Sequence, residues 1–168
     1  MDKIITKELL RAHGLPVCDF TALIKADWEK KRQELLDGIV SSLPFPVFVK
    51  PSNLGSSVGI SKVESEPELA AAIDYAFQYD RRVIVEEGIN AREIECSVLG
   101  NDEVLVSVPG EIIPHEKFYT YSSKYTTGGA DVIIPAVVDD GLKNTVQNLA
   151  LRAFKVIDGS GMARIDFL

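Results

Sequence analysis

A close succession of strand patterns in the middle of the chain most constrains its fold. Segments 82–86, 93–99 and 104–108 are rich in β-branched and apolar residues, and little sequence separates them. The glycine, asparagine and aspartate at 100–102 are typical of a tight turn that joins two strands as a hairpin. These segments therefore predict an antiparallel sheet.

Helical patterns surround these strands, with apolar residues at helical spacing and end signals where helices stop. Gly14 and Gly159 follow the first and last helix, Asp27 is in place to cap the second, and Ser65 and Glu68 have the spacing of a capping box. Helices segregated against antiparallel strands predict the α+β class. The helices are expected at 4–13, from 27 to a break at 42–46, at 65–77 and at 140–158, and further strands at 17–25, 47–50, 59–63, 131–135 and 162–168.

Length and composition limit the classes of function that the chain can have. The 168 residues suffice for one domain or two small lobes, here expected to meet near Pro109. A net charge of −7 argues against general attraction to nucleic acid or to an anionic membrane. Neither a bilayer-spanning apolar run nor a signal-peptide pattern occurs, so we expect a cytoplasmic protein with small-molecule partners. Cys18 and Cys96 have no zinc-like or disulfide-like spacing and are interpreted as buried free thiols.

A loop of small residues interrupts good strand sequence after Lys50. Gly55, Ser56, Ser57 and Gly59 form the expected tip of a hairpin, which can move as a flap. Exposed backbone N–H groups, two hydroxyls and a preceding ammonium make such a tip suitable for an anion. The Walker pattern is absent, and a plain flexible turn is the alternative interpretation.

Carboxylates gather where one strand ends and the next begins. Glu86 and Glu87 close the first, and Glu93 and Glu95 open the second. They can accept hydrogen bonds from ribose hydroxyls or an exocyclic amine, while the backbone near Ile89 can pair with a base edge. A solvated hairpin end is the alternative.

The last strand places Arg164 and Asp166 on one face, because side chains alternate along a strand. The carboxylate suits Mg²⁺, and the guanidinium suits a phosphate or a developing oxyanion. A surface salt bridge is the alternative. The segment 116–130 shows no periodicity and predicts a surface loop. His13 and His115 show neither metal spacing nor a carboxylate companion and are interpreted as bystanders.

Five segments together resemble a known family. In chain order they are MDK at 1–3, FPVFVKPSNLGSSVGISKV, VEEGINAREIE, FYTYSSKY and GMARIDF. They closely resemble the D-alanine:D-alanine ligases of the ATP-grasp superfamily. The resemblance implies an ATP-grasp fold, in which 1–108 form the central nucleotide-binding lobe and 109–168 begin the C-terminal lobe. It also implies ATP and D-alanine as partners, Mg²⁺ or Mn²⁺ as cofactor, and D-alanyl-D-alanine made through a D-alanyl phosphate for peptidoglycan synthesis.

The resemblance also assigns roles to residues. Lys3 and Lys50 match lysines that hold ATP phosphates, and Ser56, Ser57 and Gly59 match the loop that closes over them, Ser56 being counted among the catalytic residues. Glu86, Glu87 and Ile89 match the adenine-contacting stretch, and Glu93 the ribose-binding acid. Lys124 and Tyr125 match a loop over the reacting groups, Arg164 the stabiliser of the tetrahedral intermediate, and Asp166 the first magnesium ligand.

The chain also departs from the family pattern. A domain that precedes the MDK motif in the family is absent, as are a Glu-x-Asn pair and a glycine-rich loop that follow the Asp-Phe strand. We therefore expect the middle part of a ligase, inactive alone, whose full-length relatives commonly pair as homodimers. A non-catalytic ATP-binding module is one alternative. A D-alanine:D-serine or D-alanine:D-lactate ligase is another, although Tyr125 resembles the tyrosine of the dipeptide-forming enzymes.

Overall fold

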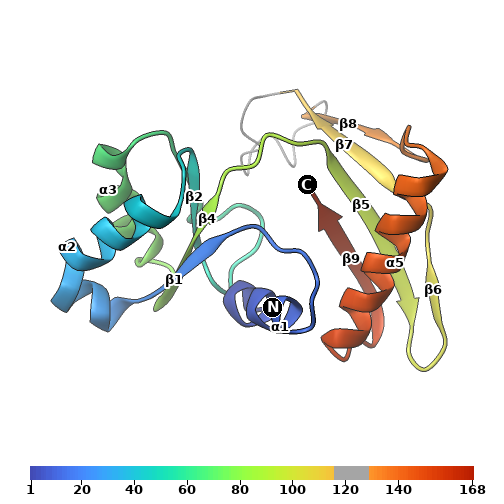
Figure 1. Cartoon of the computed structure of the whole chain (residues 1–168), viewed down its shortest axis with the longest axis horizontal. Coiled ribbons are helices and arrows are strands. Elements are labelled where there is room, and N and C mark those ends of the chain that lie inside the picture. The colour runs from blue at the N-terminus through green and yellow to red at the C-terminus, as the bar shows by residue number, and fades with distance from the viewer. Residues whose placement is uncertain (116–128) are drawn as a thin grey trace. The chain divides into compact units, whose positions relative to one another are not determined.

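The computed structural model describes residues 1–115 and 129–168, which divide into two compact units (Figure 1). The first unit comprises residues 1–7 and 17–89, and the second comprises residues 8–16 and 90–168. The division falls ahead of the boundary expected near Pro109, and the lobes 1–108 and 109–168 stay a prediction. In the described ranges, no helix has both the length and the apolar character needed to cross a bilayer.

The first unit is built on a four-stranded antiparallel sheet in the order β1-β4-β2-β3. Alternate residues of the strands, among them Val47, Val49, Val83 and Val85, are buried in one hydrophobic core. Helices α2 and α3 contribute buried residues to that core. The other face of the strands therefore carries the intervening residues. Its elements are α1 (Lys3–Ala12), which begins in this unit, β1 (Phe20–Ile24), α2 (Lys25–Ser42), β2 (Val47–Pro51), β3 (Ser61–Val63), α3 (Glu66–Ala76) and β4 (Arg82–Glu87).

The second unit is a five-stranded antiparallel sheet with one long helix along it (Figure 1). Its order is β6-β5-β7-β8, and β9 pairs with β5. Ile94, Cys96 and Val98 of β5 lie in one core with Ala150 and Phe154 of the helix. The elements are β5 (Glu93–Gly100), β6 (Val104–Val106), β7 (Gly110–Pro114), β8 (Ala130–Ile133), α5 (Asp140–Val156) and β9 (Gly161–Phe167).

These elements confirm the α+β class and the antiparallel strands of the sequence prediction. The hairpin of β2 and β3 forms as expected, with Val47 opposite Val63. Gly14, at φ 69°, has the left-handed conformation expected after α1. Strand β7 was not predicted, because its apolar stretch is too short to show a clear alternation.

Three helix-end predictions are wrong in detail. Helix α2 begins two residues before Asp27, because the N–H of Lys25 donates to the carbonyl of Arg81 at 3.0 Å and so is satisfied by the neighbouring chain. Ser65 is the N-cap residue of α3, as its position predicts, but its hydroxyl donates to the Glu68 carboxylate at 3.0 Å and makes no capping bond to the backbone.

Helix α5 ends at Val156, and the left-handed residue after it is Asp158, at φ 52°, not Gly159. A β-carbon on Gly159 would lie 2.6 Å from a ring carbon of buried Phe154. Gly159 is therefore required by its close contact with Phe154. The left-handed conformation at the helix end is adopted by the preceding residue, Asp158.

Candidate functional site

Buried Glu86 is the centre of a charged cluster on the sheet face opposite α2 and α3. Its carboxylate lies 2.5 Å from the Lys50 ammonium and 3.4 Å from that of Lys7, and its side chain is 8% exposed. Burial by itself raises the pKa of Glu86, but the two lysines outweigh it and lower the pKa below its ordinary value. The carboxylate is therefore ionised and serves as counter-ion to two cations.

Lys7 was not predicted from the sequence, although a signal for it exists. It follows Lys3 by four residues on α1, and residues four apart lie on the same side of a helix. Once Lys3 is a candidate, Lys7 is therefore the next cation on that side. Its ammonium also lies 2.6 Å from the Cys18 sulfur, so this thiol is half-buried beside a cation and not fully buried as predicted.

Lys3 belongs to the same cluster and is held by the chain that leads into the serine-bearing loop. Its ammonium donates to the carbonyls of Pro51 at 2.9 Å and Leu54 at 2.5 Å. Burial, followed by the nearby charge of Lys50, lowers the pKa of Lys3. The Lys3 and Lys50 ammonium groups thus repel each other, the carboxylates of Glu86, Asp80 and Asp2 offset part of that repulsion, and a bound anion would relieve more of it.

The loop between β2 and β3 has an unusual backbone. Ser56 and Ser57 both have positive φ, at 52° and 59°, and Gly59 has φ 71°. Non-glycine residues in this conformation cost about 1 kcal/mol or more each, and such strain clusters at functional sites. A β-carbon on Gly59 would meet Pro51 at 2.7 Å and the Tyr79 ring at 2.8 Å, so only glycine fits the base of this loop.

The end of β4 and the residues that follow it, predicted to contact adenine, form a backbone edge anchored on both sides. The N–H of Asp19 donates to the Glu87 carboxylate at 2.8 Å, and the N–H of Gly88 donates to the carbonyl of Pro46 at 2.8 Å. A β-carbon on Gly88 would lie 2.6 Å from that same carbonyl oxygen. Ile89 follows directly and is 42% exposed, which leaves its side chain available to a ligand.

In the second unit, β9 presents Arg164 and Asp166 on the face that α5 does not cover. Arg164 donates to both Asp166 oxygens, at 2.7 and 3.0 Å. Its Nε is also 2.7 Å from Oε2 of Glu95, but the N–H points to Asp166. Oε2 of Glu95 is therefore buried and in ionic contact with Arg164, but it accepts no hydrogen bond from the described residues. Burial raises the pKa of Glu95, and the negative charges of Asp166 and Glu93 raise it further. The positive charge of Arg164 lowers it, but by less than the others raise it.

The structure thus brings Lys3, Lys50 and Glu86 together in the first unit, with the serine-bearing loop beside them. Glu93, Arg164 and Asp166 belong to the second unit, and their cooperation with the lysines stays a prediction. The predicted residues Lys124 and Tyr125 lie outside the described residues.

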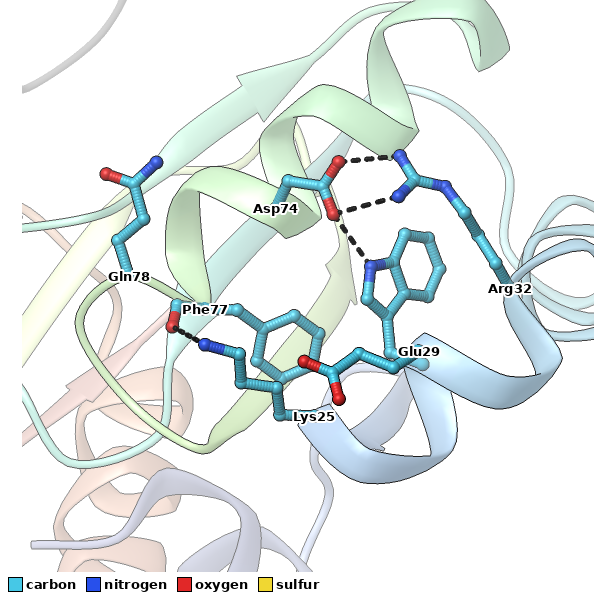
Figure 2. A pocket seen from close by; sticks show the side chains of 7 residues that line it. Lys25, Glu29, Arg32, Asp74, Phe77 and Gln78 are labelled. Carbon is cyan, nitrogen blue, oxygen red and sulfur yellow. Dashed lines mark hydrogen bonds and ion pairs between the residues drawn. The ribbon is translucent and has the colours of Figure 1, made fainter.

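A separate depression of about 330 Å³ lies between α2 and α3 (Figure 2). The Trp28 indole and the Arg32 guanidinium both donate to Asp74, at 2.8 Å for the indole and 2.6 Å for the shorter arginine bond. None of the predicted site residues lines this depression. Its lining residues are Lys25, Trp28, Glu29, Arg32, Asp74, Phe77 and Gln78.

His115, interpreted as a bystander without a carboxylate companion, does have one in the structure. Its Nε2 lies 3.0 Å from the Asp131 carboxylate. Across residues 1–115 and 129–168, no three histidine, cysteine, aspartate or glutamate side chains cluster as a metal site.

Comparison with known proteins identifies the family. The family model described as D-ala D-ala ligase C-terminus matches residues 9–168. The chain belongs to the D-alanine–D-alanine ligase family. The D-alanine–D-alanine ligase of Heliobacterium modesticaldum is 50% identical over 168 residues, which are 100% of this chain and 46% of that protein. That of Bacillus velezensis is 49% identical over 99% of this chain and 47% of its own length. The chain thus spans about half the length of these curated relatives.

Solved structures of family members have the same fold. The VanG D-Ala:D-Ser ligase from Enterococcus faecalis superposes with a TM-score of 0.85 at 37% identity, covering 99% of this chain and 47% of that one. The D-alanine–D-alanine ligase from Coxiella burnetii has a TM-score of 0.80 at 40% identity, covering 100% of this chain and 43% of that one. These similarities confirm the predicted ATP-grasp architecture.

The carboxylates of the second unit fit the metal that the family implies only in part. Glu95 and Asp166 are partners in the register of β5 and β9, and Glu95 has the orphaned oxygen described above. Mg²⁺ often binds one or two carboxylates together with substrate phosphates. The described donors therefore suit a Mg²⁺ that arrives with a nucleotide and do not make a metal site of protein ligands alone.

Proposed function

We propose that this chain binds ATP and supplies the nucleotide-binding part of a D-alanine–D-alanine ligase. The observation that carries the proposal is a cluster in which Lys7 and Lys50 contact the buried carboxylate of Glu86 and Lys3 lies near enough to Lys50 to be repelled by it. A group of cations beside a glycine- and serine-bearing loop favours a polyphosphate. Membership of a family of ATP-dependent ligases agrees with this ligand.

In the proposed complex, the residues of the first unit divide the nucleotide between them. Lys3 and Lys50 hold the phosphates, and Ser56, Ser57 and the backbone at Gly59 cover them. The edge formed by Glu86, Glu87 and Ile89 receives the adenine, and its anchoring to two neighbouring segments keeps it rigid. When the nucleotide binds, the Glu86 carboxylate gives up part of its contact with Lys50 and contacts the nucleotide instead. A phosphate group then becomes the counter-ion of Lys50.

The residues of the second unit are proposed to serve the chemistry of peptide-bond formation. A D-alanine carboxylate oxygen takes the terminal phosphoryl group of ATP as ADP leaves. The amine of a second D-alanine then forms the C–N bond, losing a proton as inorganic phosphate leaves. Negative charge grows on the carbonyl oxygen during that attack, and the fork of Arg164 suits its stabilisation. Asp166 is proposed as a ligand of Mg²⁺, which supplies neutralisation of phosphate charge, and Glu93 as the acceptor of ribose hydroxyls.

The cytoplasm is the proposed compartment, because ATP is available there. D-alanyl-D-alanine made by the full-length enzyme would enter peptidoglycan synthesis.

Binding of ATP by the chain tests the proposal. Isothermal titration with ATP and Mg²⁺ should give saturable binding, and Lys50→Gln should weaken it by about tenfold or more, since a charged contact in a partly buried site is lost. Lys62→Gln is the matched control, because Lys62 pairs with Glu64 outside the cluster. Absence of ATP binding by the unsubstituted chain, or equal effects of the two substitutions, would refute the proposal.

A second candidate changes only the acceptor of the reaction. The similarity to a solved D-Ala:D-Ser ligase favours D-serine as an alternative acceptor in this family. The test is to supply the full-length enzyme with ATP, D-alanine and an excess of D-serine or D-lactate, and to identify the products by mass spectrometry. Preferential formation of D-alanyl-D-alanine supports the first candidate, and a dominant mixed product supports the second.

A further inference from the structure

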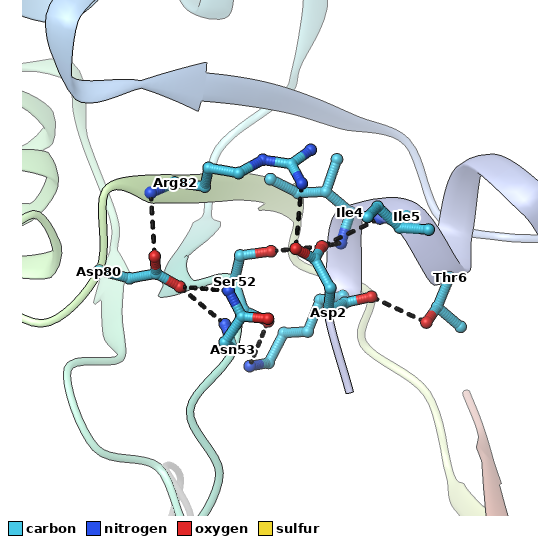
Figure 3. A network of polar contacts seen from close by, with 9 residues as sticks. Asp2, Ile4, Ile5, Thr6, Ser52, Asn53, Asp80 and Arg82 are labelled. Carbon is cyan, nitrogen blue, oxygen red and sulfur yellow. Dashed lines mark hydrogen bonds and ion pairs between the residues drawn. The ribbon is translucent and has the colours of Figure 1, made fainter.

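A polar network lies at the foot of the serine-bearing loop and contains residues to which the sequence analysis assigned no role (Figure 3). Oδ1 of Asp2 accepts from the N–H groups of Ile4 and Ile5, both at 3.0 Å, and so caps α1. The same oxygen accepts from the Ser52 hydroxyl at 2.6 Å, and Oδ2 accepts from Arg82 at 3.0 Å. Asp2 therefore joins three separate segments of the first unit.

Ser52 is the member of the network with the least freedom. It is 0% exposed, and all its polar groups have partners. Its N–H donates to the carbonyl of Arg82 at 3.0 Å, and its carbonyl accepts from the N–H of Lys3 at 2.9 Å. The residue that begins the loop is thus tied to the backbone of one candidate phosphate-binding lysine and lies two positions after the other, Lys50.

A second carboxylate secures the next residue of the loop. Oδ2 of Asp80 accepts from both the N–H and the side-chain amide of Asn53, at 2.9 and 2.8 Å. Its Oδ1 accepts from the N–H of Arg82 at 3.2 Å. The foot of the loop is therefore held at two successive residues before its strained part begins at Ser56.

We propose that Asp2, Ser52 and Arg82 are positioning residues that hold the Lys3 ammonium and the foot of the serine-bearing loop in a preformed site for the phosphates of a nucleotide. The inference rests on the proposed function and adds residues that touch no ligand. Each acts through a neighbour: Asp2 through the start of α1, Ser52 through the loop, and Arg82 through the charge it presents to Asp2.

Charge and burial explain why this network would serve binding as well as folding. The Lys3 ammonium is desolvated and repelled by Lys50, while nearby carboxylates attract it and the carbonyls of Pro51, Ser52 and Leu54 accept its hydrogen bonds. If Ser52 shifts, two of those carbonyls shift with it. If the cations and the loop are already held in place before the ligand arrives, less free energy is lost in ordering them on binding. This is the usual benefit of preorganisation.

Ser52→Ala is the first test, because it removes one hydroxyl and leaves the chain otherwise unchanged. We expect the affinity for ATP with Mg²⁺ to fall about tenfold, since the bond to Asp2 is buried, while the affinity for adenosine changes less than about twofold. Equilibrium dialysis measures both. Ser41→Ala is the matched control, because its exposed hydroxyl bonds only within α2 and should leave both affinities unchanged.

Asp2→Asn separates positioning from helix capping. Asparagine caps a helix about as well as aspartate, so α1 should be kept while the charge opposite Arg82 is lost. The same selective loss for ATP is expected, with faster amide hydrogen exchange at residues 53–60 and unchanged exchange in β4. This variant keeps the test open if Ser52→Ala folds poorly.

The outcomes are distinct. Equal weakening of ATP and adenosine in both variants would mean a purely structural role and would overturn the inference, as would unchanged ATP affinity. If the unsubstituted chain binds no ATP, the proposed function fails by itself. Hydrogen exchange at residues 53–60 then still decides whether the network positions the loop, because unchanged exchange in both variants overturns that claim without any nucleotide.

Discussion

Replacing Glu86 by glutamine should expose how much the charged cluster depends on one carboxylate. Glutamine keeps the size of the side chain and one acceptor oxygen, but it removes the negative charge shared by Lys50 and Lys7. The ammonium groups then repel one another with no buried counter-ion. The first unit should be destabilised, although no apolar contact is lost.

The size of the stability loss depends on how exposed Glu86 and its two lysine partners are. Removing one member of a buried ion pair typically costs about 3–5 kcal/mol. Here the carboxylate is 8% exposed, but the Lys50 and Lys7 side chains are 23% and 20% exposed and can turn partly to water. We therefore expect a loss of about 2 kcal/mol, which for a chain of this size lowers the melting temperature by roughly 4–8 °C.

Thermal and urea unfolding at pH 7 measure this loss, with Glu64→Gln as the control. Glu64 pairs with Lys62 at 2.6 Å but is 62% exposed, so the same chemical change there should cost less than about 1 kcal/mol. Tripolyphosphate, an anion without adenine, should raise the melting temperature of the Glu86 variant more than that of the unsubstituted chain.

The pH dependence provides an independent check. The pKa of Glu86 is lowered in the folded chain, so its contribution is present above its ordinary value of 4.5 and disappears as the pH falls through the folded value. The difference between the variant and the unsubstituted chain should therefore shrink below pH 4.5. A loss equal to that of Glu64→Gln, or a difference that persists at low pH, would refute the electrostatic account.

Three further predictions concern other parts of the site. Because the pKa of Lys3 is lowered from 10.5, its ammonium loses its proton below that pH in the free chain, and ATP affinity measured by titration calorimetry should fall as the pH rises from 7 to 10. Gly88→Ala places a β-carbon 2.6 Å from a backbone carbonyl and should lower both stability and ATP affinity, whereas Gly38→Ala, inside α2 with no atom within 4 Å, should raise the melting temperature slightly. Arg164→Lys keeps the charge but loses the two-pronged contact to Asp166, so in the full-length enzyme kcat should fall by more than tenfold with a smaller change in KM.

Local signals in the sequence predicted the parts of the fold that depend on near neighbours. The hairpin of β2 and β3 follows from two strand patterns around a glycine-bearing tip, and the left-handed Gly14 follows from its place after α1. The helix ends that were predicted wrongly depend on distant contacts. Lys25 is satisfied by the carbonyl of Arg81, and Gly159 is required by the ring of Phe154, neither of which a capping pattern reveals.

The candidate site divides in the same way. Resemblance to a family pointed to Lys3, Lys50 and Glu86, and the structure places their side chains in one cluster. It assigned no role to Asp2, Ser52 or Arg82, although Asp2 and Ser52 lie within two of the segments that carry the resemblance. Their importance becomes visible only when segments up to 80 residues apart are seen to share hydrogen bonds.

The sequence by itself therefore determined the class of fold, the family and the sheet face on which each strand residue lies, since the alternation of side chains along a strand is a local property. Only the tertiary structure decided which charges meet. The register of β2 on β4 brings Lys50 to Glu86, and the approach of α1 adds Lys7 and Lys3. Register and packing depend on the whole set of buried contacts, so no single segment carries the information that pairs these residues.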